Sequence, residues 1–579
     1  HKTQGFGNFG GGGRGGGGGG ARQESFTLLD GEPATKDILD GVDTTWARVP
    51  GGAEVGRLAD LAVAKFDVKD PAASVPALLA IRTRLDSIPS DPVVAEKRHQ
   101  LDRAIQGCLG LVVETTVPRA EVVPGEVLAL RHVATVAANV PVRWLKVHYP
   151  LTGQTAAKPI DLRAGQPATR DEKQTLPAAA ALTHPYWLRD EHSVGMFKVD
   201  TGMLIGCPES LPAFPVEHQF QVGGQTLEIA DVPVQAAALG EPARPLNVIA
   251  PVGLRYRSDV RLFAPGSERR VEVEVTAARD GVAGTLDLSA PGEWKVAPDA
   301  QPFRLASAGD RTKLAFTVRA PAQAATAGIN ARAHMGDATW TSQRALIRHE
   351  HIPAQLLQPP ARLKAVALDL AVKGRRVGYI PGAGDRVAES LGEMGYEVTR
   401  LAGDDLTPEK LRGLDAVVIG VRAYNVRSDL AAGLPALFDY VAGGGTVVAQ
   451  YNRPNGLRTT RLAPFDLRLS DARVTDENAP VTFLAPGHPA LTTPNRITAA
   501  DMDGWVQERG IYFPAQWDKH FTPILAAGDP GEKPLTGGLL VAKHGRGHFV
   551  YTGLVFFRQL PAGVPGAYRL FANLVSLGQ

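Results

Sequence analysis

A tryptophan surrounded by charged residues stands near the C-terminal end of the sequence, and this group of residue types could bind a ligand or do chemistry. Around Trp505, in "ADMDGWVQERG" and shortly after it, stand Asp501, Asp503, Glu508, Arg509 and Asp518. Two carboxylates beside an aromatic ring could bind a sugar or perform acid–base chemistry. We therefore take Asp501, Trp505 and Arg509 as ligand-binding candidates. The alternative is a charged loop packed by its own aromatic side chains.

Histidine pairs suggest metal binding. "RHEHIP" puts His349 and His351 on one face of an expected strand, but no third ligand lies nearby in the sequence, and a zinc site needs at least three protein ligands. "THPYWLRDEH" contributes His184 and His192, and the aromatic residues between them fit a core or a contact surface. Neither HExxH nor GxSxG occurs. We expect no metal and no cofactor in this chain.

The loop "GYIPGAGD" suggests nucleotide binding, because glycine lets backbone N–H groups approach a phosphate at the start of a helix. Its spacing is not G-x-G-x-x-G, and no GK[ST] is present. The next expected strand, "EVTRL", also ends without an acidic residue. A strand-to-helix turn that needs glycine explains the loop more simply.

Composition narrows the class of partner. Lys and Arg number 62 against 60 Asp and Glu, a net charge of +2, so the charge balance favours no nucleic acid or anionic membrane. The two cysteines, Cys108 and Cys207, fall in segments of different character, which argues against a disulfide framework. No apolar run is long enough for a transmembrane segment. Because the sequence begins with His1, we expect its natural N-terminus to be missing, and a secreted or periplasmic location stays open.

The elements that would position these residues change character along the chain. Residues 53–114 carry apolar positions at helical spacing, which predicts a small helical bundle. Alternation with a period of two, as in "GEVLALRHVATV", then predicts a β-sandwich to about residue 234. A second sandwich is expected over about 246–348. There "RRVEVEVTA" and "KLAFTVRAP" each place three apolar side chains on one face.

The last part of the chain reads as alternating strands and helices, which predicts a parallel, doubly wound sheet. Ligands of such sheets bind beyond the carboxyl ends of the strands, here "PGAGD", "VRAYN" and "QYNRPN". From these ends we take Tyr424, Tyr451 and Asn452 as further ligand-binding candidates.

These patterns together predict a multidomain protein. We expect a small helical bundle, two immunoglobulin-like β-sandwich modules and a C-terminal α/β doubly wound domain of flavodoxin-like type. The expected boundaries place a motif and a glycine-rich loop in 1–24, the helices in 25–113, the sandwiches in 114–242 and 243–352, and the α/β domain in 353–579.

The C-terminal domain resembles the class I glutamine-amidotransferase-like fold over roughly Gly374 to Gln579, including its trehalose-utilisation-type members. In catalytic members of that fold a cysteine sits on a strained elbow after the strand that corresponds to "GGTVVAQYN". This sequence has Tyr451 and Asn452 there and no cysteine after Cys207. The resemblance therefore implies an inactive amidotransferase-like domain, used for binding or structure.

A second resemblance joins the pieces. "HKTQG", "DILDGVDTTWARVPGG", the helical stretch and "HPYWL" are similar to the region that follows the catalytic domain in large bacterial PIG-L/LmbE-type deacetylases. These are zinc-dependent enzymes that remove acetyl groups from N-acetylglucosamine-type amides. His1 to Gln4 fit the family's H-x-[ST]-Q motif, which implies a place for His1 and Gln4 at the edge of a catalytic domain.

The family's zinc ligands lie in an A-H-P-D-D-E type motif and a later histidine pair, and this chain has no such motif. We therefore expect the non-catalytic C-terminal portion of a deacetylase, with zinc and the covalently linked catalytic domain upstream, and an N-acetyl-sugar or glycan as the partner. The chain alone is expected to be inactive. The alternative is a stand-alone carbohydrate- or surface-binding protein with an inactive amidotransferase-like domain.

Overall fold

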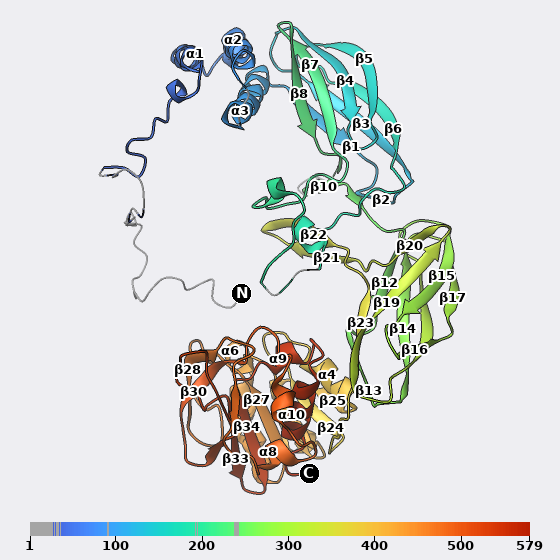
Figure 1. Ribbon diagram of the computed structural model, residues 1–579, viewed down its shortest axis with the longest axis vertical. Coiled ribbons are helices and arrows are strands. Elements are labelled where there is room, and N and C mark those ends of the chain that lie inside the picture. The colour runs from blue at the N-terminus through green and yellow to red at the C-terminus, as the bar shows by residue number, and fades with distance from the viewer. Residues whose placement is uncertain are drawn as a thin grey trace. The chain divides into compact units, whose positions relative to one another are not determined.

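The computed structural model describes residues 27, 29, 34, 36–89, 92–191, 193, 195–236 and 242–579 (Figure 1). His1, Gln4, the glycine-rich loop and His192 lie outside the described residues. The chain is a multidomain mixed α/β protein made of two compact units. Unit 1 holds residues up to 251 together with 344–359, and unit 2 holds residues 252–343 and 360–579.

Unit 1 begins with three helices, as the helical spacing predicted: α1 (Ala53–Ala64), α2 (Val75–Asp86) and α3 (Pro92–Leu109). Their apolar faces meet around Val55, Ile81 and Leu85. Leu79 of α2 and Ile105 of α3 also belong to the core of the following β-sandwich. The helices therefore share apolar packing with the first β module.

A buried arginine also joins the helices to that module. Arg82 Nε lies 2.7 Å from Asp102 Oδ1, and its Nη2 donates to the carbonyl of Thr226 at 2.8 Å. The Arg82 side chain is only 7% exposed, and its guanidinium is fully engaged by these partners and Gln225. Burying such a charge is tolerable only when it is paired and hydrogen-bonded, which fixes α2 against the sheet.

The first sandwich consists of a sheet in the order β10-β9-β1-β3-β6 and a second sheet in the order β5-β4-β7-β8. Inward positions of both sheets, such as Leu130, Trp144 and Phe220, share one core. The strands are β1 (Val112–Thr116), β3 (Val127–Thr135), β4 (Val142–Tyr149), β5 (Gln154–Leu162), β6 (Ala168–Thr175), β7 (Val216–Val222), β8 (Gln225–Asp231), β9 (Val234–Gln235) and β10 (Arg244–Pro245). Beside them β2 (Glu121–Val122) pairs in parallel with β11 (Asn247–Val248), so strand pairing continues past residue 242.

Polar side chains cross this apolar core as a connected network. Thr115 Oγ1 lies 2.8 Å from His132 Nδ1 and 3.3 Å from His218 Nε2. His132 Nε2 lies 2.8 Å from the Tyr149 hydroxyl, and His218 Nε2 lies 3.7 Å from Asp231 Oδ2. Burial, and then the neighbouring His218, lower the pKa of His132 to about 3. The imidazole of His132 is therefore neutral over the ordinary pH range.

A hairpin distant in sequence completes unit 1. Strands β21 (Ala345–His349) and β22 (Ile352–Leu357) pair with each other, and the residue that follows them, Gln358, is buried. Its side-chain oxygen accepts from the N–H of Ala250 at 3.1 Å, and its amide nitrogen donates to the carbonyls of Thr183 and Val248. Its backbone N–H donates to His184 Nδ1 at 2.9 Å. Gln358 thus holds the hairpin segment to two other segments of unit 1.

Unit 2 begins with a second sandwich (Figure 1). One sheet runs β12-β14-β18-β16 and the other β13-β23-β19-β15-β17, with β20 paired to β19. The strands are β12 (Val252–Tyr256), β13 (Val260–Phe263), β14 (Glu268–Ala277), β15 (Val282–Ser289), β16 (Lys295–Ala297), β17 (Ala300–Leu305), β18 (Arg311–Arg319), β19 (Ala325–Met335), β20 (Ala338–Trp340) and β23 (Arg362–Ala367). The alternating apolar residues of β14 and β18 are buried, as predicted, and form an apolar core.

The C-terminal part of unit 2 is a mixed, mostly parallel sheet with helices. Its order is β25-β24-β26-β27-β34-β33-β31; the first five strands are parallel, and β33 and β31 continue the sheet antiparallel. The strands are β24 (Arg376–Ile380), β25 (Glu397–Arg400), β26 (Ala416–Ile419), β27 (Thr446–Gln450), β31 (Phe521–Pro523), β33 (Leu539–His544) and β34 (Gly547–Thr552).

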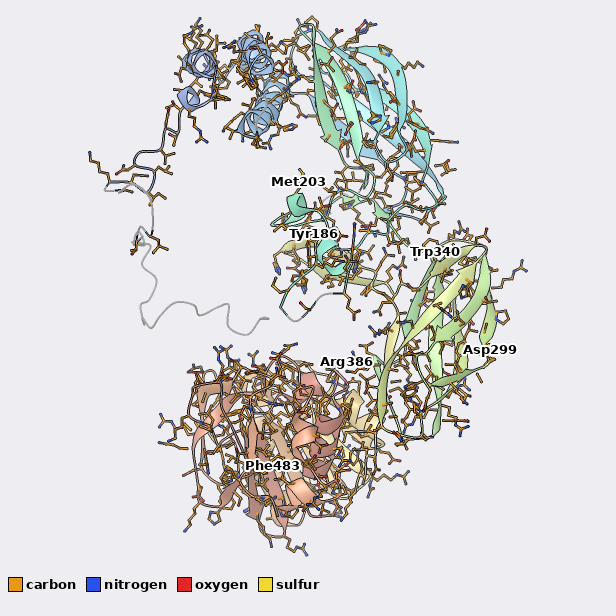
Figure 2. All side chains as sticks on the ribbon, in the orientation of Figure 1. Tyr186, Met203, Asp299, Trp340, Arg386 and Phe483 are labelled. Carbon is orange, nitrogen blue, oxygen red and sulfur yellow. The ribbon has the colours of Figure 1, made fainter. Side chains whose placement is uncertain are left out.

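Helices cover both faces of this sheet. Helices α4 (Val387–Met394) and α10 (Pro565–Val575) share a core with Val418 and Val448, whereas α7 (Leu430–Ala442) packs with Val417 and Val447 on the other face. Arg386, labelled in Figure 2, lies just before α4 and pairs with Asp259 of the second sandwich. The parallel strands β24, β26, β27 and β34 are therefore largely buried on both sides, whereas the outermost strand β25 is mostly exposed.

Candidate functional site

The carboxyl edge of the parallel sheet gathers the loops in which the sequence placed its ligand-binding candidates. Residues 381–385 follow β24, residues 421–425 follow β26 and residues 451–455 follow β27. The backbone N–H of Arg422 donates to the carbonyl of Tyr451 at 2.8 Å, which joins the second loop to the third. Because strand order reverses between β24 and β26, this is the edge at which ligands of open α/β sheets bind.

Tyr424 and Asn452 are buried at this edge and hold its loops together through hydrogen bonds. The Tyr424 ring is fully buried, its hydroxyl donates to the carbonyl of Leu462 at 3.0 Å, and burial raises its pKa. Asn452 is also buried; its Oδ1 accepts from the Tyr424 N–H at 2.9 Å, and its own N–H donates to the Tyr551 hydroxyl at 3.1 Å. Both side chains hold the loops together and present no free polar group to a ligand.

Asn425 also holds this edge together, although the sequence alone did not single it out. Its Nδ2 donates to the carbonyls of Arg453 and Asn455, and its Oδ1 accepts from the Arg453 N–H at 2.9 Å. Asn425 lies next to the candidate Tyr424 in the short helix α6 (Ala423–Val426), and its residue type was the available signal, since asparagine side chains often bond to nearby backbone groups. Asn425 fixes the backbone from which the Arg453 side chain leaves.

Asp385 closes the glycine loop. Its Oδ1 accepts from the N–H of Val387 at 3.0 Å, at the start of α4, and from the Tyr379 hydroxyl, while Oδ2 accepts from the N–H of Val421 at 3.2 Å. Burial and the Asp385 charge raise the pKa of Tyr379. The loop "PGAGD" is thus a strand-to-helix turn tied to the next loop by a carboxylate, which disfavours a phosphate in the same position.

Three aromatic rings form a row beside these loops. Tyr451 is 3% exposed, and its ring centroid lies 5.8 Å from that of Tyr512 and 5.2 Å from that of Phe557. Tyr512 and Phe557 are only partly buried. An arginine lies over each of these outer rings, with Arg453 Cζ 6.0 Å from Tyr512 and Arg558 Cζ 4.8 Å from Phe557.

A carboxylate completes one end of the row. Glu508 Oε1 lies 3.0 Å from Arg558 Nε, and the two side chains are 12% and 14% exposed. Burial raises the pKa of Glu508 although Arg558 opposes the shift. Arg558 also donates to Gln507 Oε1 at 2.6 Å. A carboxyl group with a raised pKa next to aromatic rings is the kind of group found at functional sites.

Backbone strain gathers at the same edge. Among the described residues, the non-glycine residues with a left-handed backbone are Arg422 (φ 58°), Gln507 (φ 71°) and Tyr512 (φ 54°). Arg422 is hydrogen-bonded to the carbonyl of Tyr451, the Tyr512 ring packs against the Tyr451 ring, and Gln507 accepts a hydrogen bond from Arg558. Such conformations cost about 1–3 kcal/mol each and concentrate at functional sites.

The acidic tryptophan segment is placed differently from the sugar platform that was one expectation. Trp505 is 4% exposed, and its indole N–H donates to the carbonyl of Asp501 at 3.1 Å. Asp501 pairs with Arg569 and caps the turn at Thr498, while Arg509 donates to the carbonyls of Ala479 and Met502. The cavity beside Trp505 and Arg509 has a volume of about 10 Å³, room for roughly one water molecule. These three side chains pack the loop, and no sugar ring can reach the indole face in this structure.

The histidines that suggested metal binding, His184, His349 and His351, lie in unit 1. The rings of His349 and His351 lie 5.8 Å apart on the hairpin of unit 1, and His184 is engaged by Gln358. Over the described ranges, no three His, Cys, Asp or Glu side chains come together as a metal site. None of the helices that the structure describes has the length and apolar character to cross a membrane.

Comparison with known proteins gives no family. No protein-family model and no curated protein matches the chain. Solved structures include an α2-macroglobulin mutant of Salmonella (15% identity over 44% of this chain and 16% of that chain, TM-score 0.17) and red sea bream transglutaminase (11% identity, 47% and 34%, TM-score 0.20). An exo-β-1,4-mannosidase of an Opitutaceae bacterium matches with 13% identity over 35% of each chain and a TM-score of 0.21. TM-scores this low carry no argument about function.

Proposed function

We propose that this chain is the non-catalytic C-terminal portion of a zinc-dependent N-acetyl-sugar deacetylase of the PIG-L/LmbE type, and that it supports or targets a catalytic domain encoded upstream. Its sandwiches are then immunoglobulin-like modules. Its last domain is a flavodoxin-like, amidotransferase-like fold that binds rather than reacts. A secreted or periplasmic location belongs to the same proposal.

The observation that carries the proposal is the construction of the elbow after β27. In catalytic amidotransferase-like proteins this is where a reactive cysteine would stand. Here Tyr451 and Asn452 are buried, Tyr451 within the aromatic row and Asn452 in hydrogen bonds to Tyr424 and Tyr551. A position filled by packing side chains supports a binding or structural role, since a nucleophile must be both exposed and activated.

The test compares two proteins. Acetate release from N-acetylglucosamine substrates, with zinc supplied, is measured for the 579-residue chain and for the same chain extended by its upstream coding sequence. We expect release by the extended protein alone. An upstream sequence without an A-H-P-D-D-E type motif, or zinc-dependent acetate release by the 579-residue chain itself, contradicts the proposal.

A stand-alone carbohydrate-binding function is the second candidate, and the aromatic row favours it. Partly exposed rings of Tyr512 and Phe557 stand beside the polar groups of Glu508 and Arg453, the combination that binds sugar rings and hydroxyl groups in proteins. A glycan-array screen with the purified chain tests it, and the loss of all signals in a Tyr512→Ala variant is the expected result. The burial of Trp505 makes Trp505→Ala a packing variant, unsuited to this test.

A further inference from the structure

We infer that the carboxyl edge of the C-terminal sheet binds an acidic sugar, with the sugar ring against the partly exposed rings of Tyr512 and Phe557 and its carboxylate held by Arg422 and Arg453. The inference rests on the proposed carbohydrate-binding role and adds the charge of the ligand to it. It concerns residues of unit 2 only.

Unpaired positive charge is the first observation. Across the described part of the chain, neither Arg422 nor Arg453 forms an ion pair with a carboxylate, whereas the neighbouring Arg427 and Arg558 pair with Asp429 and Glu508. Arg422 Nε is moreover buried without a hydrogen-bond partner. A buried donor on a charged group is unfavourable when it is left without an acceptor. The two terminal nitrogens of Arg422 are not buried in this way, and an anion at this edge would pair with them.

The nearby carboxylates of Asp385 and Glu508 do not pair with Arg422 or Arg453, because both have other partners. Asp385 is already bonded to Val387, Val421 and the Tyr379 hydroxyl. Glu508 stands at the far end of the aromatic row, beside Arg558. The local charge is therefore asymmetric along the row, with an unpaired arginine near Tyr512 and a compensated pair near Phe557.

The aromatic row sets the shape of the ligand. The buried Tyr451 ring is tilted by 32° to Tyr512 and by 47° to Phe557, so it packs behind two outer rings that are not parallel to it and that are themselves partly exposed. Arg453 already lies over Tyr512 and can reach a group that rests beside that ring. A sugar ring with one carboxylate fits an aromatic surface with a guanidinium at one end, because guanidinium and carboxylate groups match in bidentate geometry.

The left-handed backbone at position 422 is unfavourable for an arginine. A left-handed backbone favours glycine, yet the chain places a long cationic side chain there with its Nε out of reach of water. The fold offsets this cost elsewhere and gains a preorganised cation at the carboxyl edge. Binding of an anionic ligand would account for an arginine at this position.

The experiment measures binding of trigalacturonate to the 579-residue chain by isothermal titration calorimetry. The matched neutral ligand is its fully methyl-esterified form, which keeps the rings and removes the charge. We expect the acid to bind about tenfold or more tightly than the ester, as charge-assisted hydrogen bonds imply. Inorganic phosphate alone should bind far more weakly than the acid, because it lacks the ring.

Variants assign the contacts. Arg453→Gln and Arg422→Gly should each lower the affinity for the acid about tenfold and leave that for the ester unchanged. Arg422→Gly also relieves backbone strain, so circular dichroism should show a folded protein. Arg461→Gln is the control, since Arg461 lies over the Phe438 ring elsewhere in the same domain and should leave binding unchanged.

Equal affinity for acid and ester overturns the inference while leaving neutral carbohydrate binding intact. Loss of discrimination in Arg461→Gln but not in Arg453→Gln also overturns it, as does phosphate binding as tight as that of the acid. Each of these results is independent of acetate release by the extended protein, so the inference and the deacetylase proposal can fail separately.

Discussion

Two regions of the molecule keep polar groups in costly places, and they do so in opposite ways. In the core of the first sandwich, Thr115, His132 and Tyr149 bond to one another behind a closed apolar layer, although His218 Nδ1 next to them has no hydrogen-bond partner among the described residues. At the carboxyl edge of the C-terminal sheet, Arg422 Nε is buried without a hydrogen-bond partner among the described residues, and Arg453 lies over the partly exposed Tyr512 ring. A closed network specifies a fold, whereas an open and strained one is suited to binding. Changes in the network should therefore alter stability, and changes at the edge should alter affinity.

Acid should expose the difference most strongly. The pKa of His132 is about 3 in the folded chain against an ordinary 6.5, so the folded form binds fewer protons in this interval and stability falls as pH falls from 6.5 toward 3. The loss from this group is up to about 1.4 kcal/mol per pH unit. Hydrogen–deuterium exchange, corrected for the intrinsic pH dependence, should show β3 and β4 losing protection before β14 and β18. Equal loss in both sandwiches would contradict the network's role.

Removing one hydroxyl from the network should have the next largest effect. Tyr149→Phe leaves His132 Nε2 buried without a partner and should lower the free energy of unfolding by about 1–3 kcal/mol, measured by urea denaturation. The matched change in the second sandwich is Tyr256→Phe, which removes a hydroxyl bonded to the Ile329 carbonyl at 3.0 Å. That loss should be smaller, about 0.5–1.5 kcal/mol, because no ionisable group is stranded. The reverse order of the two losses would break the comparison.

Arg422→Gly should change stability in the opposite direction. Glycine adopts the left-handed backbone without steric cost, and the unsatisfied buried Nε disappears, so the melting temperature of unit 2 should rise with a gain of up to about 1 kcal/mol. Arg461→Gly serves as the control and should not stabilise, since Arg461 is not in a left-handed conformation. A destabilised Arg422→Gly variant would mean that the arginine has a structural role.

Arg453→Gln should have the smallest effect on stability. Arg453 Cζ lies 6.0 Å from the centroid of the Tyr512 ring, and the loop is held through backbone bonds to Asn425 that glutamine retains. We expect the thermal unfolding curve to shift by no more than about 0.5 kcal/mol, the usual range for surface changes. A larger loss would mean that the Arg453 side chain, like those of Tyr424 and Asn452, holds the loops of this edge together.

Local periodicity was enough to predict the elements and the coarse architecture. The alternation in "RRVEVEVTA" placed Val271, Val273 and Val275 on one face, and all three are buried in the second sandwich. The helical spacing before residue 114 corresponds to α1, α2 and α3. Both patterns reflect a single element facing one core, which a short window of sequence records.

A short window of sequence could not predict which distant segments pair with each other. Strand β23 joins the second sandwich beside β13 although about a hundred residues separate them, and the intervening hairpin of 345–357 belongs to unit 1. The buried network had a signal that went unused: His132 is in phase with the inward Leu128 and Leu130 of β3, and His218 with Val216 of β7. Histidine on the apolar phase of a strand indicates a buried, bonded imidazole.

Of the candidate site, the sequence located the edge but not the roles. Tyr424, Tyr451 and Asn452 do lie at the carboxyl ends of the strands, yet burial makes them supports. The strained Arg422 could not be predicted, because nothing in its type or neighbours marks a left-handed backbone. The exposure of Tyr512 and Phe557 depends on tertiary packing that no local pattern encodes.

The bonds of Gln358 have a consequence for how the two units can be separated. The chain passes between units three times, at 251–252, 343–344 and 359–360, so a single proteolytic cut leaves them connected. After a cut at the first passage, residues 344–359 stay covalently joined to unit 2 while Gln358 still grips Thr183, Val248 and Ala250 of unit 1. The hydrogen bonds of the Gln358 side chain thereby hold the two fragments together without a covalent link. To express unit 1 by itself, residues 344–359 must be included with the N-terminal fragment.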